Sequence, residues 1–309
     1  MYEKYYGFSK EPFNLNLDPR FFFLTKNFKE AWNSLIYGIT NRKGFILVTG
    51  EEGIGKTTLI GLITLYFSIT KPKIKIIPIF RPYCNLDKYV EDILGKMRFP
   101  VYRGTKSSMI SQFNNFLRQR SSDDNETLAI VFDEGQKLSN ETLDDLRLLA
   151  NPSPKSGNFI QEIFVGEPHF ERKLESRELR PLRQRMAIQV DLKPLTKEES
   201  RQYMEYRLNK AGSNISKVFA QKAENLIFRY AQGNPMIMNR VCDQAFRFGY
   251  RQMKTKIDSA SIKGAIAKLE KEIAEEAHLG GKTSSRRSKY YKRGTFFKRF
   301  FFHRWHLLA

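Results

Sequence analysis

Residues 50–57 have the types and the spacing of a loop that holds phosphate groups. They read Gly-Glu-Glu-Gly-Ile-Gly-Lys-Thr and fit Gly-x-x-x-x-Gly-Lys-[Ser/Thr] at every fixed position. Glycines let successive backbone N–H groups turn toward an anion, and the N-terminus of the next helix adds partial positive charge. Lys56 is expected to reach the β- and γ-phosphates of a nucleoside triphosphate, and the Thr57 hydroxyl to ligate Mg²⁺. The predicted nucleotide-binding residues are Gly50, Gly53, Ile54, Gly55, Lys56, Thr57 and Thr58.

Two carboxylates, Asp133 and Glu134, follow an apolar run at residues 128–132. Such a run is typical of a buried parallel strand, and open α/β sheets bind their ligands at the carboxyl edge. Asp133 is expected to hold Mg²⁺, directly or through water. Glu134 is expected to orient and polarise the attacking water, the general-base role that hydrolysis requires. An acidic pair alone is a weak signal, but on a buried strand downstream of the phosphate loop it indicates a nucleotide site.

These residues need a sheet whose strands all end on one side. The sequence predicts strands at residues 45–48, 73–80, 128–132, 159–165 and 186–192. Helices are predicted between them, at residues 28–40, 89–97, 109–120 and 140–149, with a further helix directly after the phosphate loop. Alternating strands and helices favour a parallel, doubly wound sheet, which is an α/β fold.

From Pro194 onward the pattern predicts helices alone. Thr196 and Glu199 have the spacing of a capping box that opens the first of them. The helices are expected at residues 197–208, 216–231, 236–250 and 259–277. The predicted organisation is an extended N-terminal arm (1–27), an α/β domain (28–193), a helical domain (194–280) and a basic aromatic tail (281–309). The aromatic residues of the arm are expected to pack on the core.

The charge of the chain is strongly basic, with 53 Lys and Arg against 33 Asp and Glu among 309 residues. Nine of these cations lie after residue 280, where there is no acidic residue, so the formal charge of +20 leaves +11 for the rest. A basic surface favours nucleic acid or an anionic lipid leaflet. Cys84 and Cys242 are expected to be buried reduced thiols of a cytoplasmic protein. The sequence lacks the pattern of a signal peptide and of a membrane span.

The tail combines cations with clustered aromatic residues. Residues 282–309 include phenylalanines at 296–297 and 300–302. This composition suits an anionic membrane surface, with rings at the headgroup boundary. It also suits single-stranded nucleic acid, and a tail with no fixed partner is the third alternative. Clustered rings favour the membrane, because base stacking needs spaced rings.

Several segments resemble motifs of the AAA+ ATPases of the general secretion pathway protein A family, over residues 1–270. The matching segments are 1–8, 12–13, 18–20, 44–58, 133–138, 146–151, 182–185, 192–195 and 203–208. The resemblance implies a three-layer P-loop domain with a helical lid, and a homo-oligomeric ring or filament that binds ATP and Mg²⁺ at a seam between subunits. An arginine would complete the neighbouring site in trans. Arg183 and Arg185 are the candidates, with Arg180 behind them.

The resemblance also leaves two biological roles open. The first is assistance to envelope-assembly proteins of a secretion or pilus machine, in the cytoplasm at the inner membrane. The alternative is an ATP-dependent DNA-binding protein of a transposition system, since related AAA+ proteins select transposition targets. The chain has no helix-turn-helix or zinc pattern, which weakens sequence-specific reading of DNA but not binding to its backbone.

The chain departs from the family pattern at three positions. Met236 stands where the family has a lid arginine, and Arg240, one turn later, is a poor substitute. Glu167 replaces a glutamine, and its carboxylate would repel a γ-phosphate unless it is turned away or protonated. Gly135 replaces alanine, which is expected to loosen the local backbone. These differences predict a slow ATPase that uses nucleotide mainly as an assembly switch.

Overall fold

The computed structural model describes residues 2–15, 19–80, 85–120, 126–149 and 160–279. It divides into an α/β unit, Lys26–Lys193, and a helical unit formed by Met1–Thr25 and Pro194–Ala309. The tail, residues 281–309, lies outside the described residues, and so do the predictions about its partners. Cys84 also lies outside them. Cys242 is a buried free thiol of the helical unit.

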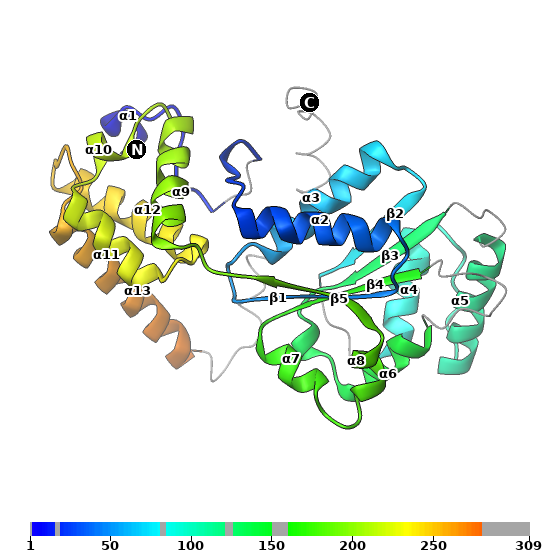
Figure 1. Cartoon of the computed structure of the whole chain (residues 1–309). Coiled ribbons are helices and arrows are strands. Elements are labelled where there is room, and N and C mark those ends of the chain that lie inside the picture. The colour runs from blue at the N-terminus through cyan, green and yellow to red at the C-terminus, as the bar shows by residue number, and fades with distance from the viewer. Residues whose placement is uncertain (1, 16–18, 81–84, 121–125, 150–159, 280–309) are drawn as a thin grey trace. The chain divides into compact units, whose positions relative to one another are not determined.

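The α/β unit is built on a five-stranded parallel sheet with the strand order β2-β3-β4-β1-β5 (Figure 1). The strands are β1 (Phe45–Gly50), β2 (Ile74–Ile79), β3 (Thr127–Phe132), β4 (Ile160–Gly166) and β5 (Met186–Leu192). Every residue of β1, β3 and β4 is buried, as expected of central parallel strands covered on both faces. Pro78 lies in β2, where an edge position tolerates its missing N–H.

Helices cover both faces of this sheet. They are α2 (Lys26–Thr40), α3 (Lys56–Thr70), α4 (Leu86–Lys96), α5 (Lys106–Arg120), α6 (Asn140–Leu149), α7 (His169–Leu174) and α8 (Arg180–Gln184). Helices α2 and α3 lie on one face, and α4–α8 share one apolar core with the other (Figure 1). In that core the Phe132 and Phe164 rings stack at a centroid distance of 5.2 Å. The core fixes the strands whose carboxyl ends carry the acidic residues.

The helical unit contains α1 (Tyr2–Tyr6), α9 (Lys197–Lys210), α10 (Ile215–Val218), α11 (Gln221–Ala231), α12 (Pro235–Arg251) and α13 (Ser259–Leu279). The capping box is confirmed, because the Thr196 side chain accepts from Glu199 N–H and the Glu199 carboxylate accepts from Thr196 N–H. The continuous helix predicted for residues 216–231 is wrong. The chain breaks at Phe219, which forms a β-bridge with Ile257, and Ala220 N–H donates to the Ile257 carbonyl at 2.9 Å.

The N-terminal arm is not extended as expected, because Tyr2–Tyr6 forms α1. The rings of Tyr2, Tyr6 and Phe8 lie within 5.5 Å, between centroids, of the Phe246 ring in the helical core. The Arg207 guanidinium donates to the backbone carbonyls of the arm, including that of Asn14 at 3.0 Å. Burial of these rings explains the aromatic composition of the arm. None of the helices in the described part of the chain has the length and apolar character of a membrane span.

Candidate active site

The phosphate loop lies between β1 and α3, as the sequence predicts. Gly55 caps α3 with a φ of 111°, a backbone conformation that side chains rarely adopt. A Cβ atom on Gly50 would lie 2.8 Å from the Leu192 carbonyl oxygen, so a larger residue cannot fit there. Both glycines are therefore required by the path of the backbone.

Lys56 is held over the loop. Its amine donates to the carbonyls of Gly50 at 2.6 Å and Glu51 at 2.9 Å, and the residue is buried. Burial lowers the pKa of this amine, while the nearby carboxylates, first among them that of Asp133, oppose the shift. A lysine has three N–H donors, so one remains for a phosphate oxygen.

Thr57 and Asp133 together form a donor set that fits Mg²⁺. The Thr57 hydroxyl donates to Asp133 Oδ2 at 3.3 Å, and Glu134 N–H donates to Asp133 Oδ1 at 2.9 Å. Burial raises the pKa of Asp133 to about 6. A hydroxyl and a carboxylate are hard oxygen ligands, and Mg²⁺ commonly takes one or two carboxylates together with substrate phosphates. When bound, the ion would neutralise charge on the phosphates and keep Asp133 ionised.

Glu134 is engaged by neighbours of its own loop. Its backbone is left-handed, with a φ of 59°. Its carboxylate pairs with the Lys137 amine and accepts from Gln136 Nε2 at 3.4 Å. Both contacts are made by the same oxygen, Oε2. A general base must be within reach of a water, so Lys137 and Gln136 compete with water for that oxygen.

Glu167 is tied to the same glutamine. Gln136 Nε2 donates to Glu167 Oε1 at 3.1 Å, and Glu167 N–H donates to Gln136 Oε1 at 3.3 Å. The other carboxylate oxygen lies 3.5 Å from His169 Nδ1. The Gln136 side chain thus links Glu134 at the end of β3 to Glu167 at the end of β4.

Gly135 is explained by packing. A Cβ atom there would lie 2.6 and 2.8 Å from atoms of the Phe170 ring, which is fully buried. The glycine makes room for this ring between the acidic loop and α7, a role that the sequence does not reveal.

We expect Gly135→Ala to destabilise the fold by about 1–3 kcal/mol, because overpacking forces the Phe170 ring or the loop to move. Gly95→Ala is the matched control, since no heavy atom lies within 4 Å of its added Cβ in α4. That control should gain about 0.5–1 kcal/mol from helix propensity. Urea unfolding measures both, and equal effects of the two variants would contradict the packing argument.

The candidate arginines differ in their surroundings. Arg183 on α8 is half exposed, and its guanidinium lies 3.3 Å from Glu175 Oε1. Arg185 instead lies over the Phe45 ring at 4.9 Å and donates to the Arg147 carbonyl at 3.3 Å. It also acts on the buried Glu162 of β4, whose pKa burial raises and Arg185 lowers. Arg183 is the more accessible of the two.

Met236 and Arg240 belong to α12 of the helical unit. Met236 N–H donates to the Asn234 side chain at 3.0 Å, which caps the helix. Arg240 forms an ion pair of 3.9 Å with Glu272 of α13, so its charge has an acidic partner within its own unit.

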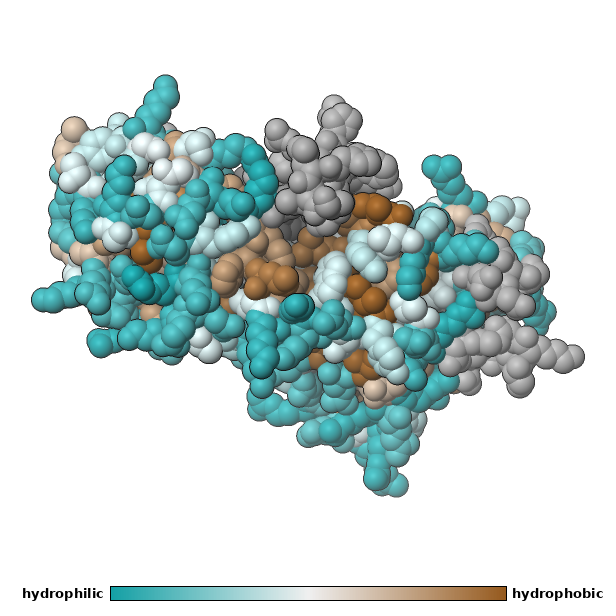
Figure 2. All heavy atoms as spheres, turned by 45° about the horizontal axis from the view of Figure 1, so that its top comes forward, coloured by the Kyte–Doolittle hydropathy of each residue, from teal (hydrophilic) through white to brown (hydrophobic). Residues whose placement is uncertain are grey.

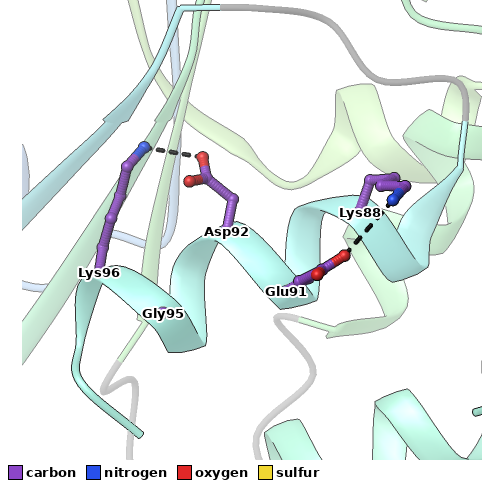
Figure 3. Close-up of a pocket in the computed structure, with 5 residues that line it drawn as sticks. All are labelled: Lys88, Glu91, Asp92, Gly95 and Lys96. Atoms are coloured by element: carbon purple, nitrogen blue, oxygen red, sulfur yellow. Dashed lines mark hydrogen bonds and ion pairs between the residues drawn. The ribbon is translucent and has the colours of Figure 1, made fainter. Parts of the chain in front are cut away.

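A shallow surface pocket lies on α4 (Figure 3). Five residues line it: Lys88, Glu91, Asp92, Gly95 and Lys96. Its charged side chains pair with one another, Lys96 with Asp92 at 2.7 Å and Lys88 with Glu91 at 3.5 Å. This pattern is that of a solvated helix face, and none of the residues of the nucleotide site contributes to it.

Comparison with known proteins accounts for the loop and the acidic pair together. Residues 39–174 match the family model described as the AAA domain. The chain carries an AAA domain. Over 264 residues, or 85% of the chain, it is 26% identical to General secretion pathway protein A of Aeromonas hydrophila, of which it spans 47%.

The fold is similar to that of solved ORC proteins. The ORC2 protein of Aeropyrum pernix, solved in ADPNP-ADP complexes, is 17% identical, with a TM-score of 0.62 over 84% of this chain and 72% of that one. Drosophila ORC bound to DNA has a TM-score of 0.64 at 15% identity, over 87% of this chain and 66% of that one. The sequence prediction of a parallel α/β P-loop domain followed by helices is confirmed.

Proposed function

We propose that this AAA domain binds ATP with Mg²⁺ and hydrolyses it slowly. The observation that carries the proposal is the convergence of the Lys56 amine, the Thr57 hydroxyl and the Asp133 carboxylate beside the glycine loop. Lys56 would contact the β- and γ-phosphates, Thr57 and Asp133 would hold Mg²⁺, and Glu134 would polarise the attacking water. The backbone of the loop, with Gly53, Ile54 and Thr58, would complete the cradle.

Slow turnover is supported by the contacts of Glu134. Its carboxylate has two side-chain partners, Lys137 and Gln136, and both compete with water for the Oε2 oxygen. Nucleotide would therefore stay bound long enough to hold an oligomer together. We propose that ATP drives assembly of a homo-oligomeric ring or filament, in which Arg183 of one subunit completes the site of the next.

The proposed setting is the cytoplasmic face of the inner membrane, where the oligomer would assist a secretion or pilus machine. The similarity to General secretion pathway protein A supports it. The second candidate is an ATP-dependent DNA-binding protein. The excess of basic residues outside the tail, +11, favours it, and one protein of the same fold was solved bound to DNA.

We expect Lys56→Ala to weaken ATP binding by about 100-fold or more, since charge-assisted hydrogen bonds contribute about 1.5–3 kcal/mol each. Titration with a fluorescent ATP analogue measures it. Lys75→Ala, an exposed lysine of β2, is the matched control and should bind as the unaltered chain does. Equal affinity of the two variants would refute the assignment of the loop.

The same preparations separate the two settings. ATP turnover stimulated by anionic vesicles would support the membrane role, and stimulation by duplex DNA would support the second candidate. Light scattering with and without ATP tests whether nucleotide changes the oligomeric state.

A further inference from the structure

One face of the α/β unit carries apolar and aromatic side chains that its own core leaves uncovered. We call it the α2–α3 face, and it consists of Trp32, Ile36, Tyr37, Leu65, Tyr66 and Ile69. Tyr37 is 55% exposed and Ile69 is 53% exposed, and the other four are partly exposed. The Trp32 and Tyr66 rings meet edge to face at 5.5 Å, which joins the two helices. Figure 2 shows apolar residues gathered over these helices.

Helix α3 is unusual in sequence. After Lys56 it has no charged residue as far as Thr70. A helix that covers a sheet normally carries charged residues on its outer face, and one that is apolar all round is normally buried. The outer side of α3, with Leu65, Tyr66 and Ile69, is therefore expected to meet a surface other than water.

Three lysines border this face. Lys29 is exposed on α2, Lys43 lies with its amine 5.5 Å from the centroid of the Tyr37 ring, and Lys71 donates to the Thr40 hydroxyl at 3.3 Å. In the described part of the chain, none of the three has a carboxylate within ion-pair distance. The only acidic residue of α2, Glu30, lies 4.0 Å from Lys26.

We propose that the α2–α3 face docks on an anionic phospholipid surface. Tryptophan and tyrosine are enriched at the membrane–water interface, where their rings lie at headgroup level. Lysines beside them can lay their alkyl chains along the apolar surface and place their amines among lipid phosphates. Lysine is depleted from protein–protein interfaces, so the lysine border favours lipid over a protein partner.

The two tryptophans of the chain allow a direct test. Trp32 belongs to the α2–α3 face and Trp305 to the tail, so Trp305→Phe leaves Trp32 as the only reporter. The full chain with this change is mixed with phosphatidylglycerol vesicles whose acyl chains are brominated. We expect the Trp32 emission to shift to the blue and to be quenched, but not with phosphatidylcholine vesicles. Trp32→Phe reports separately on the tail.

Two outcomes would overturn the proposal. One is vesicle binding, seen by co-sedimentation, with unchanged Trp32 emission, which would assign lipid contact to another part of the chain. The other is found without lipid: if quenching of Trp32 by acrylamide decreases as the protein concentration rises, a second copy of the chain covers the face.

A substitution on the face provides an independent readout. Ile69→Glu places a negative charge at an exposed position of the face. The vesicle affinity, obtained from titrations of Trp32 quenching, should fall at least tenfold in Ile69→Glu and about fivefold in Lys43→Gln. Tyr102→Glu, at an exposed position outside the face, is the matched control and should have no effect. Thermal melting checks folding, and ATP binding should be unchanged in all three. Failure of this proposal is thus distinguishable from failure of the nucleotide site, and equal vesicle affinity of Ile69→Glu and its control would refute it.

Discussion

Glu134→Gln is expected to lower ATP turnover by about 10²- to 10⁴-fold while ATP remains bound, the range that general-base catalysis contributes. The amide keeps the size of the side chain and can still contact Gln136. It cannot take a proton from water or polarise it through a negative charge. Turnover is measured as phosphate release, and binding with the fluorescent ATP analogue.

Two further variants make this result specific. Glu141→Gln changes an exposed glutamate of α6 and should leave turnover unaltered. Glu167→Gln introduces the amide that the family pattern has, keeps the acceptor for Gln136, and should not lower turnover. A loss in Glu167→Gln without one in Glu134→Gln would move the general base from the end of β3 to the end of β4.

The sequence predicts the fold well where the signal is local. The helix Asn140–Leu149 and the strand Met186–Leu192 have the predicted bounds, because a hydrophobic period defines each of them. The capping box also depends on residues three apart. The break at Phe219 could not be predicted in this way, since it results from pairing with Ile257, far along the chain.

In the candidate site, too, local features could be predicted from the sequence and long-range contacts could not. The path of the phosphate loop follows from its own glycines, so Lys56 and Thr57 could be placed before the structure was known. The hydrogen bond from Gln136 to Glu167 could not be predicted from the sequence, because it joins the ends of β3 and β4, and the order of strands in the sheet makes these two neighbours. Gln136 lies within the acidic motif, which is the one sequence signal that pointed to it.

Arg183 and Arg185 show that positions close in sequence can have different surroundings. Arg183 lies on α8 with an exposed partner, Glu175, whereas Arg185 follows the helix, lies over the Phe45 ring and donates to the Arg147 carbonyl. The two are only two residues apart, and their basic character alone cannot distinguish a solvent-facing guanidinium from one that packs on an aromatic ring.

Arg183→Gln is therefore expected to lower turnover by about 10³-fold or more with folding and ATP binding intact, as removal of an arginine supplied in trans does. Arg185→Gln should instead destabilise the fold by about 1–3 kcal/mol, because it removes the guanidinium from the Phe45 ring and leaves the Arg147 carbonyl without this donor. Urea unfolding and phosphate release separate these effects.

A mixing experiment decides whether Arg183 acts between subunits. Lys56→Ala binds ATP too weakly to fill its own site but retains Arg183, and Arg183→Gln binds ATP but offers no arginine to its neighbour. Each variant alone should be inactive. In a mixture, some subunit interfaces combine the intact Lys56 of one variant with the intact Arg183 of the other, so turnover should be regained. If the mixture stays inactive although light scattering shows that the two variants assemble together, Arg183 does not complete a neighbouring site.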